Sequence, residues 1–382
     1  MNRVRATAGR TFRSLAVRNY RLYFFGQSVS LSGTWMQSVG QAWLVLKLSG
    51  GGLALGIVTS LQFLPMLLAG PWGGVIADRV DKRRLITVTQ SVSGVLALAL
   101  GVLTVTGVVQ IWMVYVIAFL LGVVNLIDMP ARQAFVIEMV GPRDLTNAVS
   151  LNGVAMNAAR IVGPALAGIL IATIGIGPCF LANAASYIAV VAAFVVMRPD
   201  ELHRPEPAPR ARGQLRAGLS YVWSRPELRT PLLLMAVVGT LVFNFSVVLP
   251  LMVTFAFGGG AGSFGALFSA MGAGAVVGGL VIAARGRATR SLLIGSMLAL
   301  GVGLAAAAES PHLGLEVATM VPIGAASTAF IATSNSILQL ETSDQMRGRV
   351  MALFAMVFLG STPIGGPLVG WFAGRFGPRS AL

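Results

Sequence analysis

Seven residues between two long apolar stretches concentrate the ionic chemistry of this sequence. Six of the seven positions from Asp78 to Arg84 carry charge, although charged residues make up only 11% of the 382 residues. Ion pairs at a wet surface are individually weak, so a contact built from them can break and re-form. The cluster therefore suits a contact that must open. The alternative is a positively charged anchor that only sets membrane topology.

Polar side chains also gather inside an apolar stretch, residues 22–46. In a lipid-spanning helix such groups face the protein interior or a cavity rather than lipid. There they can hydrogen-bond a solute while aromatic rings pack against it, although each of them alone is more often an interhelical hydrogen bond. We expect a substrate cavity built from this stretch and later ones, with these residues: Gln27, Ser30, Thr34, Trp35, Gln37, Gln41, Asn125, Asn157, Arg160, Phe243 and Asn244.

Enzymatic and metal chemistry find little support in the sequence. The single cysteine, Cys179, excludes a disulfide framework and a clustered thiolate metal site. The two histidines, His203 and His312, lie far apart without the spacing of metal ligands. No nucleophile arrangement or phosphate-binding loop is recognisable. We therefore expect that the protein is not an enzyme and that it binds no metal or cofactor.

The composition indicates that lipid is the main solvent of this chain. Hydrophobic residues make up 55% of it, and the mean hydropathy is +0.80. A helix needs about 20 largely apolar residues to cross a bilayer. We therefore predict an all-α membrane protein with eleven spans, near residues 22–46, 53–77, 85–107, 111–130, 147–173, 177–197, 231–257, 263–284, 290–308, 313–335 and 349–373.

The net charge of +15 follows the predicted topology. Arg and Lys occupy the N-terminal tail and every second connection between spans, with Lys47 as the main exception. Because cytoplasmic loops carry an excess of Lys and Arg, we expect a cytoplasmic N-terminus. Contact with anionic lipid heads is compatible with this distribution, whereas we expect no nucleic-acid partner.

Matching residues recur in the two halves of the chain. Four pairs occur in the same order at a nearly constant offset, and two related halves are typical of secondary transporters, whose substrate site lies between them. The pairs are Gly73-Gly74 with Gly278-Gly279, Glu138 with Glu341, Gly163-Pro164 with Gly366-Pro367, and Gly177-Pro178 with Gly377-Pro378.

The repeat divides the chain into three regions. We predict an N-terminal bundle of six helices (1–197), a cytoplasmic linker rich in Pro and Arg (198–230) and a C-terminal bundle of five helices (231–382). Within the linker, "GQLRAGLSYVWS" suits a short amphipathic helix on the membrane surface. The second half stops shortly after its Gly377-Pro378, so the repeat predicts that a twelfth span is missing and that the C-terminus is external.

Several motifs resemble those of the major facilitator superfamily. The run from Gly74 to Arg84, "GVIADRVDKRR", is similar to the signature of the loop between its second and third helices, with Asp81 where the family usually has Gly. The stretches 19–37 and 128–168 look like the subgroup of enterobactin-type siderophore exporters and macrolide-efflux proteins. The resemblance covers essentially the whole chain and implies the major facilitator fold.

The resemblance implies a role for the charged cluster. In the family, the carboxylate at the position of Asp78 meets the N-terminus of the eleventh helix and holds the cytoplasmic side shut, which agrees with the attraction of anions to helix N-termini. We expect the basic residues of the cluster to find carboxylate partners, with Asp128 as a candidate. The expected cytoplasmic gate consists of Asp78, Arg79, Lys82, Arg83, Arg84 and Asp128.

A second motif lies in the fifth span. "ARIVGPALAG", with Arg160, Gly163, Pro164 and Gly168, resembles the antiporter signature of the superfamily, which is associated with export. Small residues at four-residue spacing let helices approach closely, and proline lets a helix bend. Ordinary close packing is the alternative explanation, because Ala159 and Ala167 replace the usual glycines.

The resemblance implies a multi-pass transporter of a bacterial-type inner membrane, acting as a monomer. We expect proton-coupled efflux of a hydrophobic or amphiphilic small molecule, such as a drug, macrolide or siderophore. A metabolite importer and a non-transporting receptor or scaffold are the alternatives. The proton site is not evident, since Asp128 is expected near the inner end of its span and Glu316 near the outer end of another.

Overall fold

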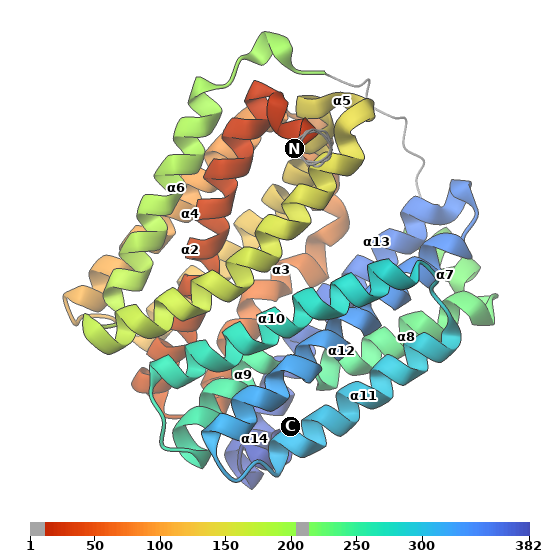
Figure 1. The fold of residues 1–382 in the computed structure, drawn as a ribbon. Coiled ribbons are helices and arrows are strands. Elements are labelled where there is room, and N and C mark those ends of the chain that lie inside the picture. The colour runs from red at the N-terminus through yellow and green to blue at the C-terminus, as the bar shows by residue number, and fades with distance from the viewer. Residues whose placement is uncertain (1–11, 204–213) are drawn as a thin grey trace, which may run out of the picture.

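The computed structural model describes residues 12–203 and 214–382, and its regular elements in these ranges are helices (Figure 1). Nine helices in this part of the chain are long and apolar enough to cross a membrane. The predicted all-α membrane fold is therefore confirmed. The number of eleven spans stays a prediction, since it counts the polar helix α2 as a span and divides α5 into two.

The first bundle contains five helices, α2 to α6. Among them, α5 has 63 residues and is broken at Gly141, whose backbone is left-handed with φ 69°. Glycine adopts this conformation without steric cost, and Pro142 follows it directly, so the chain turns there and runs back along the bundle. The helices are α2 (Arg18–Ser49), α3 (Gly52–Arg79), α4 (Lys82–Val105), α5 (Ile111–Thr173) and α6 (Gly177–Val196).

The second bundle follows a short helix, α7 (Gln214–Trp223), at the position of the expected amphipathic helix. The Tyr221 hydroxyl of α7 donates a hydrogen bond to Ser343 Oγ, at the start of α13, over 3.3 Å. The first spanning segment of this bundle is interrupted at residues 242–244 and ends in a π-helical turn, Met252–Ala256. The helices are α8 (Pro226–Leu241), α9 (Phe245–Leu251), α10 (Ala261–Arg285), α11 (Arg290–Ala308), α12 (Leu313–Leu340), α13 (Asp344–Gly360) and α14 (Thr362–Phe376).

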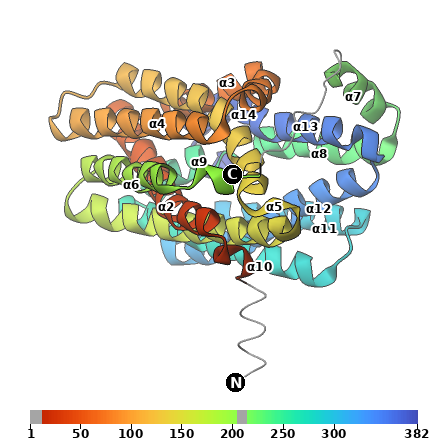
Figure 2. The same cartoon turned by 90° about the horizontal axis from the view of Figure 1, so that it is seen from above.

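Two close helix crossings join the bundles, α3 with α14 and α5 with α10 (Figure 2). At the first, a Cβ atom on Gly56 would overlap the Gly366 carbonyl, and Ser60 Oγ donates to Pro363 O over 2.7 Å. At the second, a Cβ atom on Gly265 would overlap the Pro164 carbonyl. Only glycine permits such backbone contact, so both crossings depend on these residues.

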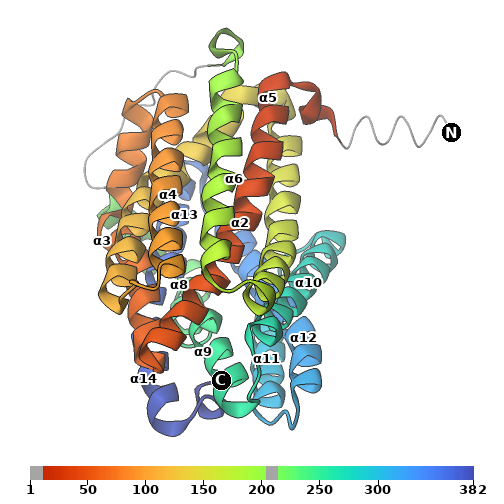
Figure 3. The ribbon, with the colours of Figure 1, turned by 90° about the vertical axis from the view of Figure 1, so that its left-hand side faces the viewer.

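The crossings lie at one end of the molecule. Gly56 is near the start of α3, Gly265 is near the start of α10, and Pro164 is near the end of α5. The two bundles meet at this end and diverge toward the end that carries the α3–α4 connection and the break in α5 (Figures 1 and 3). We name the latter the basic end, because it carries the charged cluster of residues 78–84.

The internal repeat is also present in the helix packing. Gly73 of α3 lies against the Leu126 carbonyl of α5, and Gly278 of α10 lies in the same way against the Ala325 carbonyl of α12. The Gly-Pro doublets at 163–164 and 366–367 occupy the two crossings between the bundles. Two of the repeated pairs thus mark similar backbone contacts, whereas a Cβ atom on Gly377 would meet no atom within 4 Å.

The first prediction tests the α3–α14 crossing. Gly56→Ala places a methyl group against the backbone of α14, which cannot move aside as a flexible side chain can, so we expect a loss of about 1–3 kcal/mol of stability. The matched control is Gly74→Ala on the same helix, where a Cβ meets no atom within 4 Å. Thermal unfolding of the purified proteins should show a lower midpoint for Gly56→Ala alone. Equal midpoints for both variants would contradict the tight crossing.

Candidate functional site

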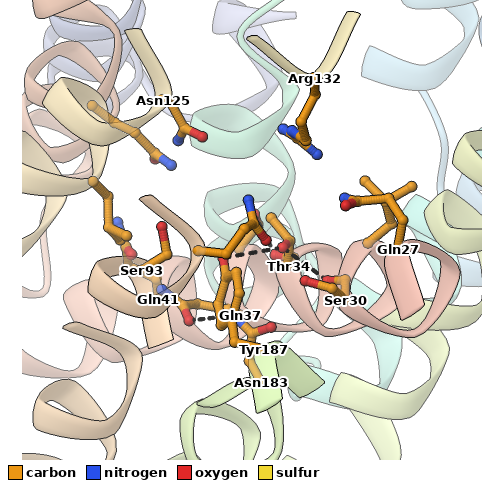
Figure 4. A pocket seen from close by; sticks show the side chains of 15 residues that line it. Gln27, Ser30, Thr34, Gln37, Gln41, Ser93, Asn125, Arg132, Asn183 and Tyr187 are labelled. Carbon is orange, nitrogen blue, oxygen red and sulfur yellow. Dashed lines mark hydrogen bonds between the residues drawn. The ribbon is translucent and has the colours of Figure 1, made fainter. Parts of the chain in front are cut away.

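A polar cavity lies among the helices of the first bundle, and α2 to α6 all contribute to its wall (Figure 4). The volume open to water-sized molecules is about 60 Å³, so the cavity is smaller in this conformation than a typical small-molecule site. Apart from Leu31 and Leu121, every lining residue is polar. The lining residues with polar side chains are Gln27, Ser30, Thr34, Gln37, Ser38, Gln41, Gln62, Gln90, Ser93, Asn125, Arg132, Asn183 and Tyr187.

The structure places part of the expected cavity residues on this wall. The polar face of α2 supplies most of them, and Asn125 comes from α5. Hydrogen bonds between helices hold this face, for example from Asn183 Nδ2 of α6 to Gln37 Oε1 over 2.6 Å. The expected residues found on the wall are Gln27, Ser30, Thr34, Gln37, Gln41 and Asn125.

The other expected residues lie elsewhere, which corrects their placement. Arg160 packs over the Trp35 ring, 5.2 Å from its centroid, at the contact between α5 and α2. Asn157 donates to Gly153 O of its own helix over 3.0 Å. Phe243 contacts the rings of other second-bundle helices, and Asn244 is buried at the break after α8, donating to Thr240 O. Arg160 and Phe243 thus serve contacts between helices, whereas Asn157 and Asn244 bond to carbonyls four residues before them.

An ionised cluster adjoins the cavity around Asp128, which is buried in α5. Asp128 Oδ2 lies 2.6 Å from Arg132 Nε, and Asp128 Oδ1 accepts a hydrogen bond of 2.5 Å from Thr89 Oγ1. Gln90 Nε2 donates to both carboxylate oxygens, each over 3.0 Å. The ion pair engages Nε of Arg132, and the rest of its guanidinium points into the cavity (Figure 4).

These contacts correct two expectations about Asp128. It pairs with Arg132 rather than with the cluster of residues 78–84. It also lies well inside its span, because α5 continues through Pro130 as far as Gly141. Glu138, at the basic end of this segment, is ten residues away, or about 15 Å along the helix. A carboxylate therefore does occupy the interior of the bundle.

The charged cluster ties α4 to its neighbours in the first bundle. Lys82 Nζ lies 2.7 Å from Glu138 Oε1 of α5. Arg83 donates to the carbonyls of Phe194 and Val195 at the end of α6, over 2.8 and 3.1 Å, where orphan carbonyls attract a cation. Arg79 and Arg84 are exposed, and the side chain of Asp78 lies outside the described part of the structure.

Asp81 has a local role at the position where the resembled signature has glycine. Its Oδ1 accepts a hydrogen bond of 3.0 Å from the Arg84 backbone N–H, so Asp81 caps the N-terminus of α4. Aspartate is among the preferred residues at this position because its side chain satisfies an otherwise unpaired donor. The departure from the signature is thus explained by helix capping.

The residues expected from the sequence did not include most of the cavity residues that α3 to α6 contribute. Gln62, Gln90, Ser93, Arg132, Asn183 and Tyr187 come from α3, α4, α5 and α6. An available signal was the occurrence of isolated amide and charged residues in otherwise apolar spans, such as Gln90 in α4.

Comparison with known proteins assigns the family. The sequence pattern of the transmembrane secretion effector family (MFS_3) matches residues 10–382. The chain belongs to this family of major facilitator transporters. It is 27% identical over 358 residues to a staphyloferrin A transporter of Staphylococcus aureus, covering 93% of this chain and 90% of that protein. It is 26% identical over 367 residues to the multidrug efflux pump Tap of Mycolicibacterium fortuitum, covering 93% and 89%.

The fold is that of solved major facilitator structures. A bacterial homologue of the human lysosomal transporter Spinster superposes with a TM-score of 0.75 at 15% identity, covering 94% of this chain and 83% of that one. The protein is therefore a multi-pass secondary transporter of the membrane and not an enzyme, as the sequence predicted.

The second prediction concerns the Lys82–Glu138 pair, whose side chains are only 15% and 8% exposed. Lys82→Glu places two carboxylates together in a mostly buried position, and we expect it to lower stability by about 3 kcal/mol. The exchange Lys82→Glu with Glu138→Lys should restore most of the loss. Arg198→Glu is the control, since it breaks an exposed pair with Glu201 and should change stability by about 1 kcal/mol or less.

Thermal unfolding in detergent measures these differences. The interpretation would be wrong if the exchanged pair were as unstable as the single variant, because the residues would then act separately.

Proposed function

We propose that this transporter exports a small molecule from the cytoplasm by alternating access, driven by the proton gradient. The observation that carries the proposal is the cavity of amide and hydroxyl groups inside a bundle of lipid-spanning helices. Such groups are costly in a membrane unless they face a solute, water or each other. The cavity is thus the proposed substrate site.

The helix crossings fit the motion that alternating access requires. The antiporter-like residues Gly163, Pro164 and Gly168 of α5 lie at contacts with other helices, and Gly168 approaches the backbone of α10. Backbone contacts of this kind suit the rigid-body rocking of one bundle against the other in alternating access. Arg160 precedes these residues and packs on Trp35 of α2. We propose that this segment is a pivot.

The direction and class of cargo come from the relatives. One is named a staphyloferrin A transporter and another a multidrug efflux pump. Together with the antiporter-like motif, these names favour export of a siderophore or drug-like molecule.

We place the basic end in the cytoplasm, because its connections carry the excess of Arg and Lys. With this orientation we propose eleven spans in two halves, residues 1–197 and 231–382, which the linker 198–230 joins. We also propose that the protein acts as a monomer. At the basic end, Asp78 and Arg79 are the proposed gate that closes against the N-terminus of α13. Lys82 and Arg83 support the gate from inside the first bundle.

The third prediction tests export and the gate together. Bacteria lacking their own drug pumps are loaded with ethidium, and dye loss is followed after energisation with and without an uncoupler. We expect expression of the protein to speed dye loss and the uncoupler to abolish the difference. Asp78→Asn removes the charge that favours closure, worth roughly 1 kcal/mol, so efflux should fall several-fold while the amount in the membrane is unchanged.

Asp81→Asn is the matched control in the same connection. Asparagine caps helices as well as aspartate does, so this variant should retain efflux. Normal efflux by Asp78→Asn would show that the cluster acts only as a topology anchor, and uncoupler-resistant dye loss would reject proton-driven export.

A further inference from the structure

The amide of Gln90 connects the buried carboxylate to the cavity. Its Nε2 donates to both oxygens of Asp128, and its Oε1 is buried and has no hydrogen-bond partner among the described residues. Gln90 is only 4% exposed and lines the cavity. A buried acceptor without a partner is costly, so this oxygen is suited to a donor that the structure does not contain.

The charge of Asp128 fixes the orientation of this amide. An ionised carboxylate only accepts hydrogen bonds, whereas an amide has a donor end and an acceptor end. The reverse orientation would place Gln90 Oε1 against two carboxylate oxygens. As long as Asp128 is ionised, the amide must therefore give its N–H groups to Asp128 and keep its oxygen, which is buried, on the side away from the carboxylate.

Protonation of Asp128 removes this restriction. The proton adds to one carboxylate oxygen and makes an O–H donor, for which the Gln90 carbonyl is the matching acceptor. Rotation of the amide then places Oε1 on Asp128 and the NH2 group on the cavity side. No covalent bond other than the new O–H forms, and the proton leaves by the same step in reverse.

We propose that Gln90 is a polarity relay through which a proton on Asp128 and a hydrogen-bond donor of the substrate exclude each other. With Asp128 ionised, the cavity offers an acceptor and binds a solute that carries N–H or O–H groups. With Asp128 protonated, the cavity offers a donor in the same place and the solute is released. The relay rests on the proposed proton-driven export and supplies its substrate class and its coupling step.

The groups around Asp128 fit this role. Arg132 on the same helix is its ion-pair partner, and Thr89 and Gln90 of α4 donate to it. The phenol groups of Tyr23 on α2 and Tyr187 on α6 lie within electrostatic range. Arg132 and Gln90 both contact Asp128 and line the cavity. Of these two side chains, only that of Gln90 has an acceptor atom, so a change of charge on Asp128 can exchange a donor for an acceptor only through Gln90.

A pair of dyes tests the substrate side of the relay. Rhodamine 123 carries amino N–H groups, and tetramethylrhodamine methyl ester is the same cation with these nitrogens methylated. Binding of each dye to the purified protein is measured by fluorescence anisotropy at a series of pH values. The readout is the ratio of the two dissociation constants, because any change of cavity charge acts equally on both cations.

In the wild type, the preference for rhodamine 123 should fall roughly fivefold as Asp128 is protonated, the worth of one hydrogen bond. Gln90→Leu, of similar size but without the amide, should give a ratio that does not change with pH. A constant ratio in the wild type, a change that persists in Gln90→Leu, or no binding of rhodamine 123 overturns the substrate assignment.

Infrared spectroscopy of the wild type tests the switch without a ligand. Protonation of Asp128 should produce a carboxylic-acid band that is absent in Asp128→Asn, and a glutamine side-chain carbonyl band should shift with the same midpoint and be lost in Gln90→Leu. An acid band without the glutamine shift overturns the relay. If efflux remained sensitive to the uncoupler in that case, the proposed exporter function would still stand. If the relay worked but no efflux occurred, export would be rejected and the relay would stand.

Discussion

Backbone contact at glycine is the constraint on which this structure depends. Lipid is as apolar as a leucine side chain, so helices in a bilayer gain little by hiding hydrophobic surface from it, and close packing must supply the attraction instead. The crossings at Gly56 with Gly366 and at Gly265 with Pro164 bring backbones into direct contact. They join two bundles that diverge toward the basic end, and large side chains such as Trp43 and Phe264 pack beside them.

The polar groups around Asp128 in the first bundle are paired with each other. The buried carboxylate of Asp128 is bonded to the side chains of Arg132, Thr89 and Gln90. Such a network is rigid when complete, and an unpaired group within it is costly. The unpaired oxygens of Gln90 and Gln27, two residues that line the cavity, are therefore informative about what the cavity receives. Lys82 and Arg83, at the start of α4, bind Glu138 of α5 and the Phe194 carbonyl of α6.

The departures from the sequence-based expectations concern where helices end and which residues pack between them. The fourth span was expected near residues 111–130, but the helix continues through Pro130. The Leu126 carbonyl, which this proline leaves without a backbone donor, lies at the close contact with Gly73 of α3. Asp128 consequently lies inside the bundle and not at its edge. Trp35 and Asn244 have the character of cavity residues, yet they stabilise a helix contact and a helix break.

The sequence by itself determined the helical membrane fold, the pairing of glycine and proline positions between the halves, and the polar face of the first span. These properties are local, since composition, helical period and the demand for glycine act on short segments. The tertiary structure alone decided that Asp128 meets Gln90, that Lys82 meets Glu138, and which polar faces enclose the cavity. A helical period tells which side of a helix is polar, but the rotation and crossing of neighbouring helices decide which side chain stands opposite.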